Sequence, residues 1–478
     1  MPRRSLLVSL AVFALPALAS PLLTQGAPPA VSAAGTTTPQ ITTSSAATQA
    51  FTDGVEDAAY IHFGRAAQRF GSALAADSTY GLARVFYASF APGLEQAQRD
   101  SMAARGVADA ARGSTGELVL AAAMRELVAN RPEAAQPLFH ALGEMYPDNA
   151  LYAMWSANDW AGTRPPAANV EAFRKVTQRF PSFGAPYNTL AYSLLLTGDT
   201  TGALGAAAKQ VELAPTQPNP HDTYAELLQF AGRLDEAVAH YTDATRRDPS
   251  FTEGYVGVAE VRQLQRRGAD ARAALNDAVR HALNLQDSLR YMEYIAQSEV
   301  VDGRNKEAAT QLAAVARLAE SRGAKPQAAA AHRDMALLAA LDKDARGTAQ
   351  HLAAARGVGA TATPPQARQQ ADVAALAYLV AGSADSLRAM AAGSDSAHLV
   401  QAMVLLQDGR AEDALRQLAQ ADTTAPITQE LSAEAHALLK QSDVARAERQ
   451  HLLARRDAVY FNAPDLRNAV ALRRAAKM

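Results

Sequence analysis

Residues 218–251 read PNPHDTYAELLQFAGRLDEAVAHYTDATRRDPSF, and the architecture of the chain can be worked out from them. They contain two segments with the apolar spacing of an amphipathic helix. Gly232 lies between the segments, where a residue that tolerates a positive φ suits a tight turn. Asp248-Pro249 ends the second segment, because proline cannot continue a helix. These residues therefore predict one helical hairpin.

The hairpin repeats along the chain with a period of 34 residues. Prolines that follow helical runs recur at this spacing. Alanines recur with them, at positions where the paired helices would touch and a larger side chain would push them apart. The columns are Pro147, Pro181, Pro215 and Pro249; Ala123, Ala157, Ala191, Ala225 and Ala259; Ala135, Ala203 and Ala237, interrupted by Asn169; and Phe139, Phe173, Ala207 and Tyr241.

A 34-residue repeat of two helices resembles the tetratricopeptide repeat (TPR) family. The resemblance is clearest over residues 114–303 and weaker elsewhere, and between Gly357 and Ser394 the pattern indicates no register. It implies an all-α fold, a right-handed α-solenoid of stacked antiparallel helical hairpins. We expect about eleven hairpins and no strands, with each hairpin burying its apolar face against its neighbours.

The first 19 residues have the pattern of a secretory signal peptide. Arg3 and Arg4 precede an apolar run over residues 6–18, and the small residues at 17 and 19 predict cleavage after Ala19. The run is too short to span a bilayer, although an uncleaved N-terminal anchor is the alternative. We therefore predict an exported protein, either periplasmic or secreted.

The rest of the chain divides into three predicted parts. Residues 20–52 carry no charged side chain and are rich in Pro, Thr, Ser and Ala, which predicts a flexible tether. Residues 53–463 are expected to form the TPR-like array. Residues 464–478, which include Arg467, Arg473 and Arg474, predict a polar capping helix at the C-terminus.

Charge and cysteine content exclude several classes of function. The 478 residues carry a formal net charge of −2, so the chain has no electrostatic footprint for nucleic acid. It contains no cysteine, which excludes disulfides, thiolate metal sites and a cysteine nucleophile. After signal cleavage we expect no stable membrane insertion. The sequence predicts no oligomeric state.

The chain carries no recognised catalytic motif, so we predict no catalytic, cofactor-binding or metal-binding residues and expect no enzyme. Residues 357–362, GVGATA, fit a dinucleotide-binding pattern only superficially, because a predicted helix precedes them and two prolines follow. His221, Asp222 and Glu226 are close in sequence, but on a helix His221 points away from the two carboxylates. A solvated groove face is therefore favoured over a metal site, and an enzyme is the least favoured function.

In TPR proteins the first helix of each hairpin lines the concave binding surface. By register, that face here should present a polar strip that stacks from helix to helix. Its acidic members would repel an acidic ligand, so we expect a basic or neutral protein or peptide as the partner. The predicted groove residues are Asn188, Tyr192, Leu195, Asp222, Glu226, Gln229, Val256, Glu260 and Gln263.

Both tryptophans, Trp155 and Trp160, are predicted to lie in one helix within an aromatic-rich part of the chain. They either enlarge the core between adjacent hairpins or form an aromatic site for a peptide or a glycan. The sequence thus favours an exported TPR-like scaffold or adaptor that binds a protein or peptide. The alternative is a cell-envelope glycan-binding or uptake accessory protein that uses the aromatic site.

Overall fold

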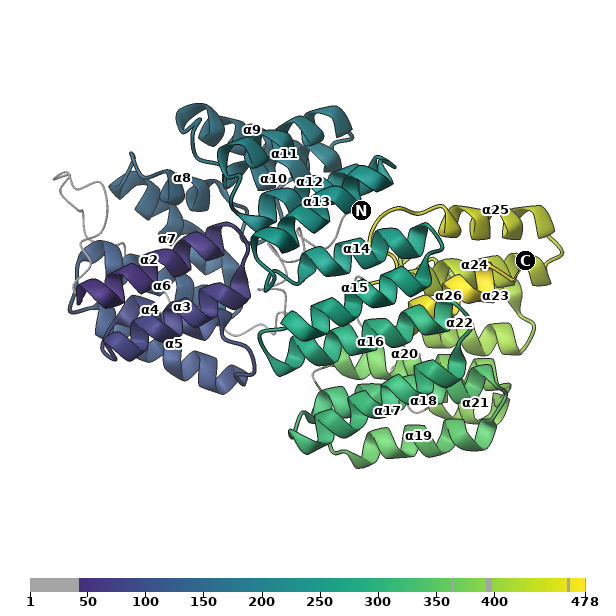
Figure 1. Ribbon diagram of the computed structural model, residues 1–478. Coiled ribbons are helices and arrows are strands. Elements are labelled where there is room, and N and C mark those ends of the chain that lie inside the picture. The colour runs from purple at the N-terminus through teal and green to yellow at the C-terminus, as the bar shows by residue number, and fades with distance from the viewer. Residues whose placement is uncertain (1–42, 363, 393–397, 462–464, 478) are drawn as a thin grey trace. The chain divides into compact units, whose positions relative to one another are not determined.

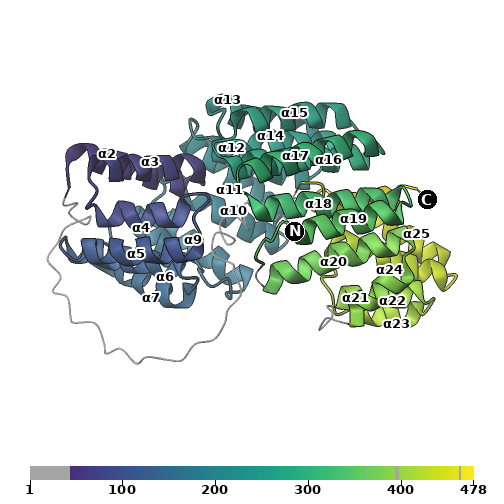
Figure 2. The same ribbon diagram turned by 90° about the horizontal axis from the view of Figure 1, so that it is seen from below.

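The computed structural model describes residues 43–362, 364–392, 398–461 and 465–477. Over these residues the secondary structure is helical, with the 25 helices α2–α26 and no strand, as predicted. The contacts divide the chain into two compact units, Met1–Gly254 (unit 1) and Tyr255–Met478 (unit 2). Within each unit, helices that follow one another in the chain lie side by side as hairpins (Figures 1 and 2).

Unit 1 is an array in which each helix packs on the next one along the chain. The most extensive pairings join α2 with α3, α4 with α5, and α12 with α13, so successive pairs form the predicted hairpins. The helices are α2 (Ser45–Ala59), α3 (Phe63–Ala76), α4 (Gly81–Phe90), α5 (Gln96–Ala110), α6 (Thr115–Val128), α7 (Pro132–Met145), α8 (Ala150–Ala157), α9 (Pro166–Arg179), α10 (Pro186–Leu196), α11 (Thr200–Leu213), α12 (Pro218–Phe230) and α13 (Leu234–Arg247).

Unit 2 continues the same hairpin arrangement, and α14 (Glu253–Leu264) begins just before its first residue. The remaining helices are α15 (Gly268–His281), α16 (Leu285–Val301), α17 (Asn305–Ser321), α18 (Lys325–Leu341), α19 (Ala345–Gly357), α20 (Pro364–Ala381), α21 (Ala384–Ala392), α22 (His398–Gln407), α23 (Ala411–Leu418), α24 (Pro426–Leu438), α25 (Ser442–Leu453) and α26 (Leu466–Ala475). Helices α20 and α21 therefore occupy the region in which the repeat pattern indicates no register.

The alanine column explains why the two helices of a hairpin can approach each other closely. Ala123, Ala191, Ala225 and Ala259 are fully buried, which confirms their predicted place at helix contacts. Ala157, in the same column, is only half-buried, because it is the last residue of the short helix α8. A methyl side chain fills these contacts without forcing the helices apart, since protein interiors are close-packed.

The turn inside the hairpin α12/α13 has the predicted geometry. Gly232 has a φ of 82°, and the N–H of Arg233 donates a 2.9 Å hydrogen bond to the carbonyl of Leu228, which satisfies an otherwise orphaned end of α12. One repeat later Arg266 adopts a φ of 60° at the equivalent position. The repeat thus tolerates a non-glycine residue there, at a cost of about 1 kcal/mol.

The predicted tether extends too far along the chain. Helix α2 begins at Ser45, and Ser44 caps it by accepting a hydrogen bond from the N–H of Ala47. Ala47 and Phe51 are buried, and Phe51 packs against Phe70 of α3. Residues 45–52 are therefore ordered despite their lack of charge, because two apolar side chains reach the core. The predicted signal peptide and residues 20–42 lie outside the described residues.

The predicted C-terminal capping helix is also corrected. A helix is present at α26, but it packs on α16 and α24 as well as on α25 and does not simply cover the end of the array. Val470 and Ala471 are fully buried, while the polar side chains of the helix, Asn468 and its arginines, are half-buried. Among the described helices, none combines the length and the apolar character that a membrane span requires.

Candidate functional site

The predicted groove residues of unit 1 do stack between consecutive helices. The hydroxyl of Tyr192 (α10) donates a 2.7 Å hydrogen bond to the carboxylate of Glu226 (α12), and the side-chain amide of Asn188 donates one of 2.7 Å to Thr223. Their predicted exposure to solvent is wrong, however, since the whole set is buried. The set comprises Asn188, Tyr192, Leu195, Asp222, Glu226 and Gln229.

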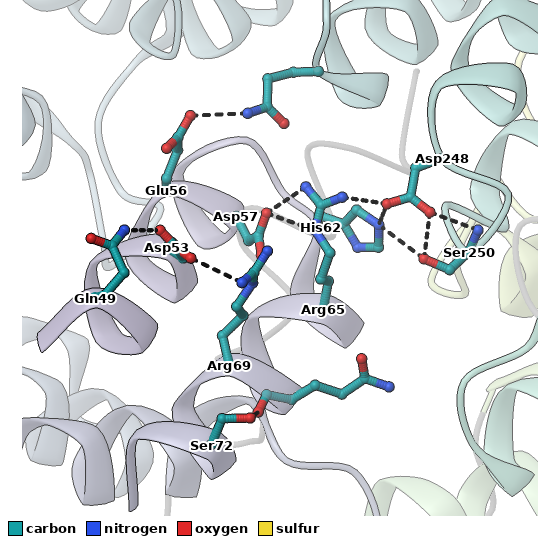
Figure 3. A network of polar contacts seen from close by, with 12 residues as sticks. Gln49, Asp53, Glu56, Asp57, His62, Arg65, Arg69, Ser72, Asp248 and Ser250 are labelled. Atoms are coloured by element: carbon teal, nitrogen blue, oxygen red, sulfur yellow. Dashed lines mark hydrogen bonds and ion pairs between the residues drawn. The ribbon is translucent and has the colours of Figure 1, made fainter. Parts of the chain in front are cut away.

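This burial accompanies a closure within unit 1, because its first hairpin folds back onto its last ones. His62 and Arg65, at the start of α3, both contact the carboxylate of Asp248, which follows α13 (Figure 3). The distance from the His62 ring nitrogen to the carboxylate is 3.1 Å. Tyr60 packs against Ala185 and Ala214 in the same region. The first hairpin thus meets the start of α10 and the residues that follow α11 and α13.

A small apolar pocket lies within unit 1. Its volume is about 110 Å³. The first helices α4, α6, α8 and α10 all contribute to its wall, and aromatic rings and methionines dominate the lining. Among the lining residues are Phe63, Phe86, Phe90, Met124, Met154, Trp155 and Trp160.

The two tryptophans are largely committed to packing. Trp155 lies in α8, whereas Trp160 follows the end of that helix, so the prediction of one shared helix is wrong. The Trp160 ring stacks on Phe139 with ring centroids 4.6 Å apart, and its indole N–H donates a 2.9 Å hydrogen bond to the carbonyl of Trp155. Trp155 in turn packs against Phe86 and Phe139. The rings therefore serve the core and also form one wall of the pocket.

In unit 2 the predicted groove residues lie under the C-terminal segment. Val256, Glu260 and Gln263 are all buried, and Gln263 accepts a 2.9 Å hydrogen bond from Ser298 of α16. The Glu260 carboxylate accepts hydrogen bonds from three successive backbone N–H groups. These come from Val459 at 2.8 Å, Tyr460 at 3.2 Å and Phe461 at 3.0 Å. Glu260 thus binds the backbone of a segment about 200 residues further along the chain.

The helix that follows this segment is held by acidic side chains. Arg467 pairs with Asp372 of α20 at 3.1 Å and with its neighbour Asp465 at 2.6 Å. Arg474 pairs with Glu434 of α24 at 2.5 Å and approaches Glu430 of the same helix at 3.7 Å. We call the described residues 455–461 and 465–477 the tail. The tail occupies the face formed by first helices of the hairpins, including α14, α16, α20 and α24.

Further buried acids lie near the start of α26. Burial raises the pKa of Asp334 to about 8, and the charge of Asp465 adds to the effect, while Arg333 and Arg467 oppose it. Burial also raises the pKa of Glu293 well above its usual value, and the neighbouring Asp334 raises it further. Two carboxyl groups at this position therefore retain protons at a pH where exposed acids have lost them.

Three polar side chains that the sequence analysis did not group come together in the hairpin α12/α13. Nδ1 of His221 lies 3.3 Å from Nδ1 of His240 and 3.9 Å from the carboxylate of Asp243. Burial lowers the pKa of His221 to about 4, and Arg247 and His240 lower it further. Asp222 is not part of this group, so the carboxylate partner comes from the facing helix. The sequence contains one signal for the pair of His221 and His240. They are 19 residues apart, a spacing that brings facing positions of one hairpin together.

No family model matches the chain, and no curated protein matches it. Among solved structures it is similar to TTC0263, a thermophilic TPR protein in Thermus thermophilus, with 18% identity and a TM-score of 0.33 over 37% of this chain and 97% of that one. It is also similar to a tetratricopeptide repeat protein from Parabacteroides merdae ATCC 43184, with 9% identity and a TM-score of 0.34 over 57% and 94%. A further similar structure is YrrB, a TPR protein with an unusual peptide-binding site, with 16% identity and a TM-score of 0.28 over 39% and 95%.

Proposed function

We propose that this chain is an exported TPR-like scaffold or adaptor that binds a protein or peptide on the face formed by the first helices of its hairpins. One observation carries the proposal: unit 2 already holds a polypeptide segment on that face, namely its own tail. The contacts of the tail therefore describe a ligand chemistry that unit 2 accommodates. The proposal assigns no catalysis to the chain.

The chemistry of the tail favours a basic or neutral partner over an acidic one. Glu260 accepts hydrogen bonds from backbone N–H groups. Any peptide without proline at those positions can supply such groups. Asp372, Glu430 and Glu434 recognise arginine side chains on a helix. A partner that matches the tail has a short stretch with free backbone donors followed by a basic amphipathic helix, a helix-in-groove mode of recognition.

The binding test keeps the chain intact during folding. A site for a specific protease is inserted between Leu453 and Val459, so that the tail can be cut after the full chain has folded. A fluorescent peptide with the sequence of residues 455–478 is then added, and its anisotropy reports exchange with the cut tail. We expect saturable binding of the peptide to the cut protein and little binding to the uncut protein, whose own tail competes.

The matched control is the same peptide with Arg467 and Arg474 changed to glutamate. We expect it to bind at least roughly tenfold more weakly, because Asp372 and Glu434 would then face negative charge. Equal binding of the two peptides, or no binding of either, would remove the tail as a guide to the partner.

Export is a separate part of the proposal, and the first 19 residues support it. N-terminal sequencing of the protein purified from its native cell tests this point. We expect the mature chain to begin at Ser20, because cleavage is predicted after Ala19. A chain that retains Met1 or the apolar run would contradict cleavage.

The aromatic pocket of unit 1 is a second candidate binding site. Sites for drug-sized ligands usually measure about 300–1,000 Å³, whereas an engineered cavity of about 150 Å³ binds benzene. A volume of about 110 Å³ and an apolar lining therefore suit one apolar side chain of a partner better than a sugar unit of a glycan. The pocket favours a protein partner over the glycan alternative.

A further inference from the structure

The hairpin α12/α13 carries a group of side chains that the proposed peptide binding does not use. His240 and Asp243 lie three residues apart on α13, so they share one face of that helix. His221 approaches them from α12. One ligand atom from each of the three residues lies within 4.8 Å of the other two. Facing helices commonly build metal sites from such pairs of positions.

The distances fit a tetrahedral metal ion. Zn²⁺ binds imidazole nitrogens at about 2.0–2.1 Å, which places two nitrogens of a tetrahedron roughly 3.3 Å apart. The Nδ1 atoms of His221 and His240 are separated by 3.3 Å. A direct hydrogen bond between the two rings would have a similar length, so this distance does not by itself separate a hydrogen-bonded pair from a metal site. The position of the Asp243 carboxylate favours the metal site. Asp243 lies 3.9 Å from Nδ1 of His221, where it supplies a third ligand after a small rotation.

Two arginines compete with the ion for this carboxylate. Arg246 pairs with Asp243, but its side chain is 71% exposed, and exposed ion pairs of this kind contribute little to stability. Arg247 is held by the carbonyls of Pro215 and Asp243 and stays near the group. An ion that binds Asp243 therefore displaces Arg246 and tolerates Arg247, which predicts moderate and not tight affinity.

We propose that His221, His240 and Asp243 form a zinc site that links the two helices of the hairpin α12/α13. Imidazole and carboxylate ligands suit Zn²⁺. Three protein ligands leave the fourth tetrahedral position open to water or to a donor atom from a partner. The site belongs to unit 1 and is independent of the tail, so it adds a metal-dependent property to the proposed scaffold.

The chain offers a matched control for this site. His332 and His351 have the same 19-residue spacing in the hairpin α18/α19, and their rings stack with centroids 6.1 Å apart. Within the described part of the chain, only the group around His221 brings three such ligands together. Glu320 lies 3.2 Å from Nε2 of His332, but it does not form a three-ligand group with both rings. This histidine pair should therefore bind Zn²⁺ much more weakly than the group around His221.

The test is calorimetric titration of the metal-free, full-length protein with Zn²⁺, supported by the visible absorption of Co²⁺ as a report on coordination geometry. We expect one equivalent of Zn²⁺ to bind the native protein. His240→Ala should abolish this binding, Asp243→Asn should weaken it at least roughly tenfold, and His351→Ala should leave it unchanged. Arg246→Ala should bind at least as tightly as the native protein, because a competitor for Asp243 is gone.

Circular dichroism of each metal-free variant establishes that it is folded before titration. His240 and Asp243 are only half-buried, so both variants are expected to fold. Three results would overturn the proposal: no saturable binding by the native protein, native affinity in His240→Ala, or an equal loss of affinity in His351→Ala.

Discussion

At the scale of single residues, the sequence predicts which helix face carries Glu260 but not that another part of the chain covers this face. The repeat register places Glu260 on the face of a first helix, together with Val256 and Gln263. That register contains no indication that residues 459–461 would cover this face. The carboxyl group is fully buried, and hydrogen bonds from three backbone donors offset the cost of removing it from water.

Glu260→Gln tests this dependence. The amide keeps the size of the side chain but offers one acceptor oxygen in place of two and turns an NH₂ group toward a backbone donor. We expect the free energy of unfolding to fall by about 2–4 kcal/mol, since hydrogen bonds to charged groups are worth roughly 1.5–3 kcal/mol each. Urea unfolding followed by circular dichroism measures the change. The exposed Glu212→Gln is the control and should alter stability by less than about 0.5 kcal/mol.

Asp334 predicts how the stability of unit 2 depends on pH. Its pKa is about 8 in the folded chain and 3.8 for the free group, so between these values the folded state binds the additional proton. The contribution of Asp334 to the free energy of unfolding is therefore fully present below pH 3.8. It is lost as the pH rises from there toward 8. We expect the native chain to lose roughly 2–4 kcal/mol between about pH 5 and pH 8 from this group, on the scale of about 1.36 kcal/mol per pKa unit.

The measurement compares thermal midpoints across that pH range. Asp334→Asn should make the curve less steep, because the substituted side chain does not titrate; the slope that remains is expected from Glu293, whose pKa burial also raises. Asp443→Asn, at a position that is 94% exposed, should follow the native curve. If Asp334→Asn and the native chain had parallel curves, the buried carboxyl would not be the titrating group.

At the scale of elements, the hairpin depends on small residues where two helices cross. The alanine column that predicted the fold contains two positions with different surroundings, which can be compared directly. Ala225 is fully buried inside the hairpin α12/α13, whereas Ala157 lines an open cleft at the end of α8. One column position therefore occurs in two environments, and the local packing decides what each one tolerates.

Ala225→Leu should destabilise the protein by about 1–3 kcal/mol, because the added atoms have no space between α12 and α13. Ala157→Leu adds the same atoms next to an open cleft and should change stability by less than about 1 kcal/mol. Denaturant midpoints of the two variants provide the comparison. A smaller loss for Ala225→Leu than for Ala157→Leu would contradict the packing account.

At the scale of the whole molecule, each unit contains long-range contacts that a repeat pattern does not include. In unit 1 the first hairpin contacts Asp248, which is 183 residues from Arg65 and 186 from His62. The pKa of Asp248 lies well below its usual range: burial opposes this shift, but hydrogen bonds from His62 and Ser250 outweigh it. This interaction fastens α3 to the end of α13.

Asp248→Ala should loosen the first hairpin. Removal of the carboxylate leaves the buried His62 and the half-buried Arg65 without their shared partner, and breaking a buried pair in this way typically costs about 3–5 kcal/mol. Hydrogen–deuterium exchange is the measurement, and we expect faster exchange in α2 and α3 than in the native chain. Asp148→Ala, at an exposed position, is the control and should leave that exchange unchanged.

Over residues 114–303 the amino-acid sequence alone specifies the helical hairpins, their 34-residue register and the residues on each helix face. These features follow from contacts within a hairpin and between adjacent hairpins, where spacing along the chain translates directly into spacing on a helix. The tertiary structure decides three further sets of contacts: the first helices of unit 2 hold the tail, the first hairpin of unit 1 meets Asp248, and His221 meets His240. The contacts of Glu260 with the tail and of Asp248 with the first hairpin join residues more than 180 positions apart. They bring together segments whose apolar surface is buried, although nothing in the repeat spacing pairs them. The third depends on how α12 and α13 turn their side chains toward each other, which is set by the packing of the pair.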